Sequence, residues 1–365
     1  MQRQGRRNNN SFKSSFYYLV KLSVGIVGLP NVGKSTLFKA LTKININVAN
    51  YPFATIDPNV GIVSVPDERV DKLAELSKSK EKIPAVVEFY DIAGLVRGAN
   101  TGEGLGNKFL NHIRGVSVIL HVVRAFESSD ITHVEKSVDP VRDIEIINTE
   151  LSLKDMELVE RALGRAERDA KTGDKEKIKQ LEILRRLKAK LDGGALLNTF
   201  DKGILDEPFV RELGLLTAKP QLFLINGSEG DVSDELKDTM EKLGSEYIIA
   251  DLAEGADIDE LVRRAYSILG LISFFTTGEK ETRAWTVGDG ARAPEAAGVI
   301  HTDFEEKFIR AEVINWEKLL ESGGPSAVSS GQSNWWNEAK SKGLIRIEGK
   351  EYLVKDGDVL IIRHS

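Results

Sequence analysis

The chain has 365 residues, which is enough for two or three domains that each bury a core. Its composition is that of an ordinary soluble globular protein, and its formal net charge of −6 excludes binding to nucleic acid or a membrane by bulk attraction alone. It has no cysteine and no apolar run of about 18 residues, which excludes disulfides, thiolate chemistry and a transmembrane helix, and we expect a cytoplasmic protein.

Residues 1–20 form a basic N-terminal extension, which begins MQRQGRRNNN and contains no acidic residue. A transit peptide has this kind of composition, but the segment is short and shows no clear amphipathic face. We therefore expect a disordered extension or the product of an upstream start codon.

Five short apolar runs predict β-strands, and helical patterns lie between them. These runs are residues 22–28, 85–90, 116–123, 220–225 and 246–250. Strands that alternate with helices predict an open, largely parallel sheet covered on both faces, which is an α/β fold.

A phosphate-binding loop follows the first predicted strand. Residues 28–35 (GLPNVGKS) match G-x-x-x-x-G-K-[ST] between a buried strand and a helix start. Gly28 and Gly33 let the backbone curl so that its N–H groups point at phosphate oxygens. Lys34 is expected to contact the β- and γ-phosphates, and the Ser35 hydroxyl to bind Mg²⁺. The nucleotide-binding residues predicted from this loop are Asn31, Val32, Gly33, Lys34, Ser35 and Thr36.

A second phosphate-site motif begins at the end of the strand over 85–90. Asp91 to Gly94 fits D-x-x-G, in which the aspartate approaches Mg²⁺ and the glycine N–H meets the γ-phosphate. Residues 50–59 are too rich in turn formers to be helical, and Thr55 within them is a candidate Mg²⁺ ligand of a switch loop. The alternative is an ordinary surface loop. The predicted metal ligands are therefore Ser35, Thr55 and Asp91.

The group that positions the attacking water is left open by the sequence. Leu95 stands where Ras-like enzymes carry a glutamine, so either hydrolysis is slow or another group takes this role. His112 and His121 are the candidates, beside Lys34 and Gly94. An exposed helix residue is the alternative for His112, and a hydrogen-bonded core residue for His121. As a further route, Asn31 is a candidate ligand for K⁺, whose charge would replace an arginine finger.

A charged helical segment over 149–192 interrupts the strand–helix alternation. Apolar residues recur at spacings of three and four on either side of a K-T-G-D turn at 171–174. This pattern predicts an antiparallel helical hairpin inserted in the sheet domain. A solvated coiled coil and a binding arm are both consistent with it.

The loop after the strand over 220–225 should hold the base. A GTPase would read Asn-Lys-x-Asp there, whereas this chain has Asn226, Gly227 and Glu229. Losing two charge-assisted bonds to guanine, at about 1.5–3 kcal/mol each, removes roughly 3–6 kcal/mol. An asparagine amide can instead pair with N6 and N7 of adenine. We expect ATP to be preferred over GTP, while a longer carboxylate that still reaches guanine is the alternative.

The pattern changes after residue 276. Runs at 281–287, 309–313, 351–354 and 358–363 predict short strands with helices between them, which form a small α+β module. Because this module carries more acidic than basic residues, any contact with RNA must be made locally by a few residues.

The chain resembles the YchF or Obg-like ATPase family over about residues 21–365. The resemblance rests on the stretches GLPNVGKST, NYPFATIDPNVG, DIAGLVRGANTGEGLGNKFLNHIR and ITHVEKSVDPVRDIEIINTEL, and on TRAWTVGDGARAPEAAGVIHTDFE, which is similar to the family's C-terminal TGS module, a β-grasp fold. Residues 1–20 lie outside the family pattern, Ala250-Asp251-Leu252 replaces the usual second base loop, and 323–343, with Trp335 and Trp336, matches poorly.

The resemblance implies an Mg²⁺-dependent P-loop ATPase of the Obg type with slow intrinsic turnover. It also implies association with the ribosome, either with one ribosomal subunit or with the whole 70S particle, and ribosomal RNA is a candidate contact. Neither a membrane nor DNA is an expected partner. The alternatives are an Obg-type GTPase and a nucleotide-sensing scaffold with negligible turnover. We expect an extension (1–20), an NTPase domain (21–130 and 213–276), a hairpin insertion (131–212) and a TGS domain (277–365).

Overall fold

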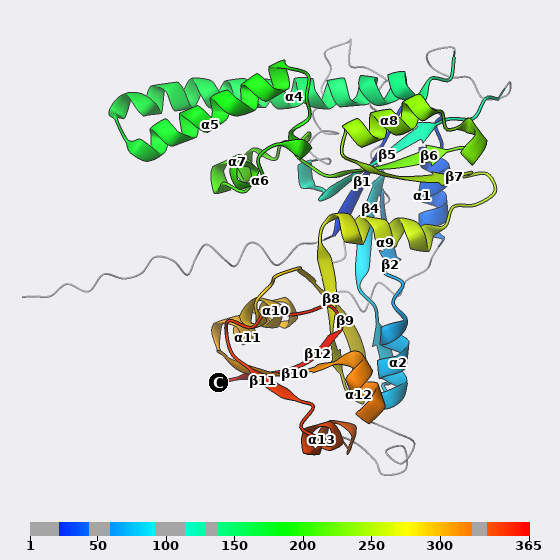
Figure 1. Ribbon diagram of the computed structural model, residues 1–365, viewed down its shortest axis with the longest axis vertical. Coiled ribbons are helices and arrows are strands. Elements are labelled where there is room, and N and C mark those ends of the chain that lie inside the picture. The colour runs from blue at the N-terminus through cyan, green and yellow to red at the C-terminus, as the bar shows by residue number, and fades with distance from the viewer. Residues whose placement is uncertain (1–21, 44–58, 92–113, 129–136, 323–333) are drawn as a thin grey trace, which may run out of the picture.

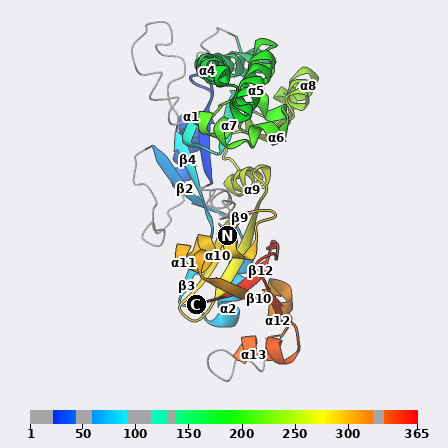
Figure 2. The ribbon, with the colours of Figure 1, turned by 90° about the vertical axis from the view of Figure 1, so that its left-hand side faces the viewer.

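The computed structural model describes residues 22–43, 59–91, 114–128, 137–322 and 334–365. These residues form two six-stranded sheets that lie end to end, with a helical arm projecting from the first sheet (Figures 1 and 2). Within these ranges, no helix is long and apolar enough to cross a bilayer.

The first sheet has the strand order β2-β4-β1-β5-β6-β7. Every neighbouring pair is parallel except β2 and β4. The strands are β1 (Ser23–Val27), β2 (Val60–Ser64), β4 (Val86–Asp91), β5 (Val118–Arg124), β6 (Gln221–Asn226) and β7 (Glu246–Ala250). The expected α/β fold is confirmed, and β2 is an addition that the sequence pattern did not predict.

Helices cover this sheet on both faces, which is why its central strands are continuous apolar runs. On β6, Leu222 and Leu224 belong to the apolar cluster that contains α1 (Lys34–Thr42) and α9 (Ile258–Ile268). The alternate residues Phe223 and Ile225 pack with α8 (Asp234–Lys242) and with Ile144.

The arm is a hairpin of α4 (Pro140–Asp169) and α5 (Lys175–Asp192), joined by the short helix η3 (Ala170–Thr172). Asp139 begins α4 by accepting a hydrogen bond from the Arg142 N–H, with Pro140 in the first turn. Gly173, at φ 77°, makes the turn that a β-carbon would strain. The inserted helices and their turn therefore lie where the sequence pattern predicted a hairpin.

Shorter helices at the base of the arm return the chain to β6. They are η4 (Leu197–Thr199), α6 (Lys202–Leu205) and α7 (Pro208–Leu213). Together with α4 and α5 they enclose a separate apolar cluster, which includes Val159, Leu187 and Val210. The arm thus has a core of its own.

The second sheet, here called the C-terminal sheet, has the strand order β11-β10-β12-β8-β9-β3. Its strands are β3 (Glu81–Ile83), β8 (Leu271–Thr277), β9 (Glu281–Gly288), β10 (Phe308–Asn315), β11 (Arg346–Glu348) and β12 (Asp358–His364). The helices around it are α2 (Glu68–Ser77), α10 (Ala293–Ile300), α11 (Thr302–Glu306), α12 (Trp316–Ser322) and α13 (Asn334–Ser341).

This sheet differs from the sequence expectation at three places. Strand β8, which lies before the expected boundary at 276, forms an antiparallel hairpin with β9. Strand β3 comes from the N-terminal half and pairs with β9. Residues 351–354 do not form the predicted strand and contribute a single bridge, between Arg292 and Leu353, while β11 pairs with β10.

Candidate nucleotide-binding site

The loop between β1 and α1 has the tight curl that its glycines predicted. Gly28 and Gly33 have φ of 149° and 109°, a region that side chains disfavour. A β-carbon on Gly28 would overlap the Val122 carbonyl oxygen, and one on Gly33 would lie 2.6 Å from Asn226 Nδ2. Asn31 also has a positive φ, of 62°. The loop therefore wraps against β5 and β6 at the start of α1, where a helix dipole favours an anion.

Lys34 lies over the centre of this loop. Its Nζ donates hydrogen bonds to the carbonyl oxygens of Gly28 (3.0 Å) and Leu29 (2.6 Å). Burial lowers the pKa of Lys34 to about 8, against the opposing effect of the Asp91 carboxylate. Ser35 and Thr36 are exposed at the same helix start. The ammonium group of Lys34 and the exposed hydroxyls of Ser35 and Thr36 thus lie together at the start of α1, next to the position expected for a bound phosphate.

Asp91 ends β4 directly beside the loop, since it pairs with Ile26 of β1. Burial raises the pKa of the Asp91 carboxyl, while the charge of Lys34 opposes this shift. Its Oδ1 is buried and has no hydrogen-bond partner within the described ranges. An unpartnered carboxylate oxygen at this position fits a ligand, or the hydration shell, of a hard divalent cation.

Three residues of the predicted metal and catalytic set, Thr55, Gly94 and His112, lie outside the described residues, as does Leu95.

The structure places His121 in the interior of β5, where it is 1% exposed and its ring centroid lies 5.2 Å from that of Phe223. Burial, with the Lys34 charge, lowers the pKa of His121 to about 3, so the ring is neutral. This favours the core-residue interpretation, and we do not retain His121 among the catalytic candidates.

The side-chain amide of Asn226 holds neighbouring loops together, whereas the sequence predicted that it would contact the base. Its Nδ2 donates to the Val32 carbonyl (2.9 Å), and its Oδ1 accepts from the Leu252 N–H (3.0 Å). The side chain is 4% exposed and ties the phosphate loop, β6 and the loop after β7 together. The amide nitrogen and oxygen that were predicted to bind adenine are therefore already hydrogen-bonded within the protein. Only the second N–H of Nδ2 and the second lone pair of Oδ1 remain for a base.

The rest of this loop disfavours a guanine-type site. Glu229 is exposed at the start of the short helix η5 (Glu229–Asp231). Asp231 instead accepts bonds from the Ser228 N–H (2.8 Å) and hydroxyl (2.7 Å), which lower the pKa of Asp231. A β-carbon on Gly227 would lie 3.1 Å from Asp231 Oδ2 and 3.3 Å from Ala125 Cβ. The lysine of a GTPase loop would be crowded at position 227.

Two residues at the end of β5 join the candidate set, although sequence reasoning missed them. Arg124 is fully buried opposite Asn226, and its Nε donates to the Phe126 carbonyl at 3.0 Å. Its guanidinium lies 4.5 Å from the Phe126 ring centroid, and that ring is partly exposed. An aromatic ring beside the base loop suits stacking on a purine. The signal in the sequence is an aromatic residue two positions after the end of a buried strand.

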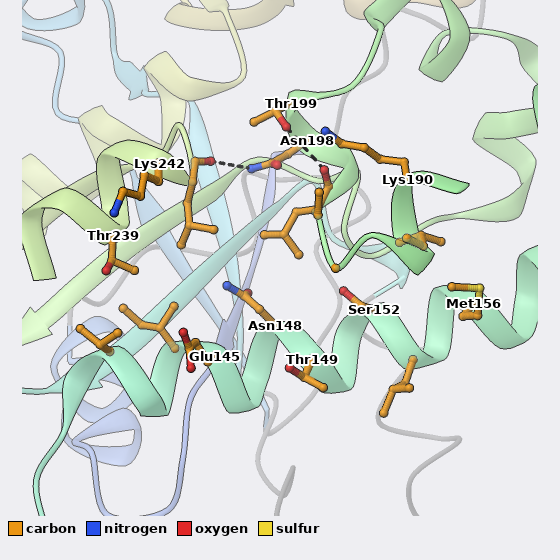
Figure 3. A pocket seen from close by; sticks show the side chains of 18 of the residues that line it. Glu145, Asn148, Thr149, Ser152, Met156, Lys190, Asn198, Thr199, Thr239 and Lys242 are labelled. Carbon is orange, nitrogen blue, oxygen red and sulfur yellow. Dashed lines mark hydrogen bonds between the residues drawn. The ribbon is translucent and has the colours of Figure 1, made fainter. Parts of the chain in front are cut away.

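A second concave region lies at the base of the arm and shares no residue with the predicted nucleotide set. This groove of about 1040 Å³ lies between α4, α8 and the segment 194–199. Figure 3 shows Asn148 and Ser152 on α4 below Asn198 and Thr199 on the opposite wall. Asn148 accepts a bond from Gln221 Nε2 and so joins the arm to β6, while Asn198 donates to the Leu243 carbonyl and joins the base of the arm to the end of α8.

Comparison with known proteins gives a consistent result along the whole chain. Residues 23–159 match a family model described as a 50S ribosome-binding GTPase, and residues 271–365 match the C-terminal YchF-GTPase model, described as a protein of unknown function. The chain is 45% identical to the ribosome-binding ATPase YchF of Bacillus subtilis (strain 168), covering 94% of this chain and 99% of that protein. It is 42% identical to Obg-like ATPase 1 of Oryza sativa subsp. japonica, covering 94% of this chain and 92% of that protein. The solved structure of the Schizosaccharomyces pombe YchF GTPase superposes with a TM-score of 0.79 at 36% identity, covering 94% and 98% of the two chains.

Proposed function

This chain belongs to the YchF family of Obg-related P-loop NTPases, and from this premise we propose that it binds and hydrolyses ATP as a nucleotide-controlled switch on the ribosome. The observation that carries the proposal is the pairing of β1 with β4, which sets Lys34 of the phosphate loop beside Asp91, whose Oδ1 has no hydrogen-bond partner among the described residues. A curled loop, a cation and an acid at the ends of adjacent parallel strands are the parts that phosphoryl transfer needs. The relatives are named ribosome-binding ATPases, which supports the ribosome as partner and a cytoplasmic location.

Each residue of the phosphate site has a proposed role. The backbone N–H groups of the loop and Lys34 Nζ would hold the β- and γ-phosphates, and Ser35 and Asp91 would hold Mg²⁺. When bound, Mg²⁺ supplies positive charge that offsets charge on the phosphate oxygens. Thr55 and Gly94 stay in the proposed set, as does His112 for positioning water. Asn31, exposed at its positive-φ position, is proposed to bind K⁺.

The base loop supports adenine over guanine. No carboxylate is buried at the loop position that would grip the guanine edge, because Glu229 is exposed and Asp231 binds Ser228. The Phe126 ring is the proposed stacking surface, and Asn226 holds the loops around the base in place. Neither group requires the 2-amino substituent of guanine.

Displacement of a fluorescent ATP analogue by unlabelled ATP and GTP tests the base assignment. We expect ATP to compete at least tenfold better, because guanine loses bonds of about 1.5–3 kcal/mol each. Phe126→Ala should weaken binding of the analogue. Phe200→Ala, which removes an aromatic ring at the base of the arm, is the control and should leave this binding unchanged. Tenfold better displacement by GTP would support the GTPase alternative instead.

Single-turnover phosphate release tests whether the protein is a switch or a scaffold. The rate is measured with and without ribosomes, in K⁺ and in Na⁺, beside a Lys34→Ala control. We expect the ribosome to raise the rate, and K⁺ to raise it only while Asn31 is present. A rate that never exceeds the control would favour the scaffold with negligible turnover.

A further inference from the structure

The segment 65–85 leaves the first sheet at the end opposite the nucleotide site. β2 and β4 form an antiparallel ladder from Val60 and Tyr90 to Ser64 and Val86. Asp91 lies at the site end of this ladder, where its N–H donates to the Asn59 carbonyl at 2.9 Å. At the other end the Val65 N–H donates to the Ala85 carbonyl at 2.8 Å, and the chain between them forms α2 and β3. This segment is therefore a rigid extension of the two strands that reach Asp91.

Both elements are built into the C-terminal sheet. β3 is its edge strand and pairs in parallel with β9 from Glu81 and Glu281 to Ile83 and Arg283. Both ribbon views place α2 beside α12 and this sheet, beyond the ends of β2 and β4 (Figures 1 and 2). Apolar side chains from α2, β8, β9 and α12 belong to one cluster, which continues into the core of the first sheet; they are Val70, Leu73, Phe275, Ala284 and Leu319.

Polar contacts fix α2 to the same sheet. Arg69 Nη1 lies 2.5 Å from Asp356 Oδ2 on the turn before β12, and the Arg69 guanidinium carbon lies 5.0 Å from the Phe275 ring centroid. Arg69 Nε also pairs with Asp67 at 2.8 Å, and Asp67 caps α2 through the Arg69 N–H. Ser77 Oγ lies 2.6 Å from Thr277 Oγ1 of β8. The ion pair spans 287 residues of sequence and joins the two halves of the chain.

A second connection runs from the base loop of the proposed site, through α9, to the C-terminal sheet. Leu252, which donates to Asn226, lies in the loop before α9. At the far end of α9, the Tyr266 hydroxyl lies 2.9 Å from Ser273 Oγ and 3.0 Å from Thr286 Oγ1, on β8 and β9. The C-terminal sheet is thus contacted through α2 and β3 on the phosphate side and through α9 on the base side, in addition to the apolar cluster that it shares with the first sheet. A displacement of one connection against the other would rotate the sheet.

We propose that α2 and β3 form a transmission element through which a change at the Asp91 edge of the nucleotide site reaches the C-terminal sheet. The inference rests on the proposed nucleotide site and adds how its state is passed on. α2 and β3 move as part of the C-terminal sheet and are driven by β2 and β4, with the contact through Tyr266 as the pivot.

Hydrogen exchange of the full chain with Mg²⁺ and a non-hydrolysable ATP analogue tests this coupling. We expect the analogue to slow exchange in β9 and β3 by about fivefold or more, as coupling of typical size requires. Four-residue Gly-Ser insertions after Pro66 and after Pro84 should abolish this change and leave the affinity for the analogue unaltered. An equal insertion after Gly173, which faces open space at the arm tip, is the control and should keep the change.

Arg69→Met gives a milder second variant if the insertions impair folding. It removes the ion pair with Asp356 but keeps an apolar stem against Phe275, so we expect a smaller exchange response at equal affinity. Arg161→Met, which removes a bond within α4 only, is its control. Tight binding with exchange changes confined to the phosphate loop, or an undiminished response in both variants, would overturn the coupling alone. No binding of the analogue to the unaltered chain would overturn the proposed function and the coupling together.

Discussion

Asp155 on α4 anchors the arm to the first sheet by a buried carboxylate. Its Oδ1 accepts from the Leu216 N–H (2.8 Å), and its Oδ2 from the Thr217 N–H and hydroxyl (2.7 Å each). Asp155→Asn keeps the shape but turns an amide N–H₂ toward these donors. Because a buried donor without a partner costs about 1–3 kcal/mol, we expect a loss of unfolding free energy of that size. Urea denaturation measures it. The exposed Asp192→Asn is the control and should change stability little, and an equal loss in both would refute the anchor role.

Lys219 gives a pH dependence with a definite sign. Its Nζ donates to the Arg114 (3.1 Å) and Val116 (2.6 Å) carbonyls, and burial lowers the pKa of Lys219 from 10.5 to about 8. Between these values the unfolded chain binds more protons than the folded one, so this group makes the protein more stable as pH rises from 8 to 10.5. Relative to Lys219→Met, the unaltered protein should gain thermal stability across this window. Thermal melts of both proteins at several pH values test it. A difference in melting temperature that does not change between pH 8 and 10.5 would contradict the assignment.

At the scale of elements, the C-terminal sheet needs α2 and β3 from the other half of the chain. Val70 and Leu73 are buried against it, and burying each large apolar side chain contributes about 1.5–3 kcal/mol. We therefore expect the fragment 271–365 to unfold without cooperativity, and linkage of residues 67–83 to it to restore a cooperative transition. Circular dichroism melts of both fragments measure this. A fragment 271–365 that melts as sharply as the full chain would show that the sheet is independent.

The sequence predicted those elements whose structure depends on their own residues, and it missed those that depend on a distant partner. β1, β5 and β6 were predicted because both their faces are buried, which leaves continuous apolar runs. β3 was not, because its three residues form a strand only through a partner 200 positions away, as the register of Glu81 with Glu281 shows. In the site, the phosphate loop follows from the motif spacing and its place between a strand and a helix, whereas the observed contact of Asn226 depends on Val32, 194 residues distant. Contacts of this kind leave no periodic signal.

At the scale of the whole molecule, the proposed nucleotide site lies between two connections to the C-terminal sheet. The phosphate side connects through β4, α2 and β3, and the base side through α9 and Tyr266. The arm leaves the first sheet on the side covered by α8 (Figure 1). The arm and the C-terminal sheet are therefore both attached to the sheet that carries the proposed nucleotide site.

We infer that the loop at Lys34 and the carboxylate of Asp91 together hold the triphosphate of ATP with Mg²⁺. Isothermal titration of the full chain with Mg²⁺-ATP tests it most directly, beside Lys34→Ala, Asp91→Asn and a control, Lys171→Ala, at the exposed arm tip. We expect one site in the unaltered chain and in the control, no measurable binding to Lys34→Ala, and binding to Asp91→Asn that no longer depends on Mg²⁺. Unchanged ATP binding in both site variants would contradict the account.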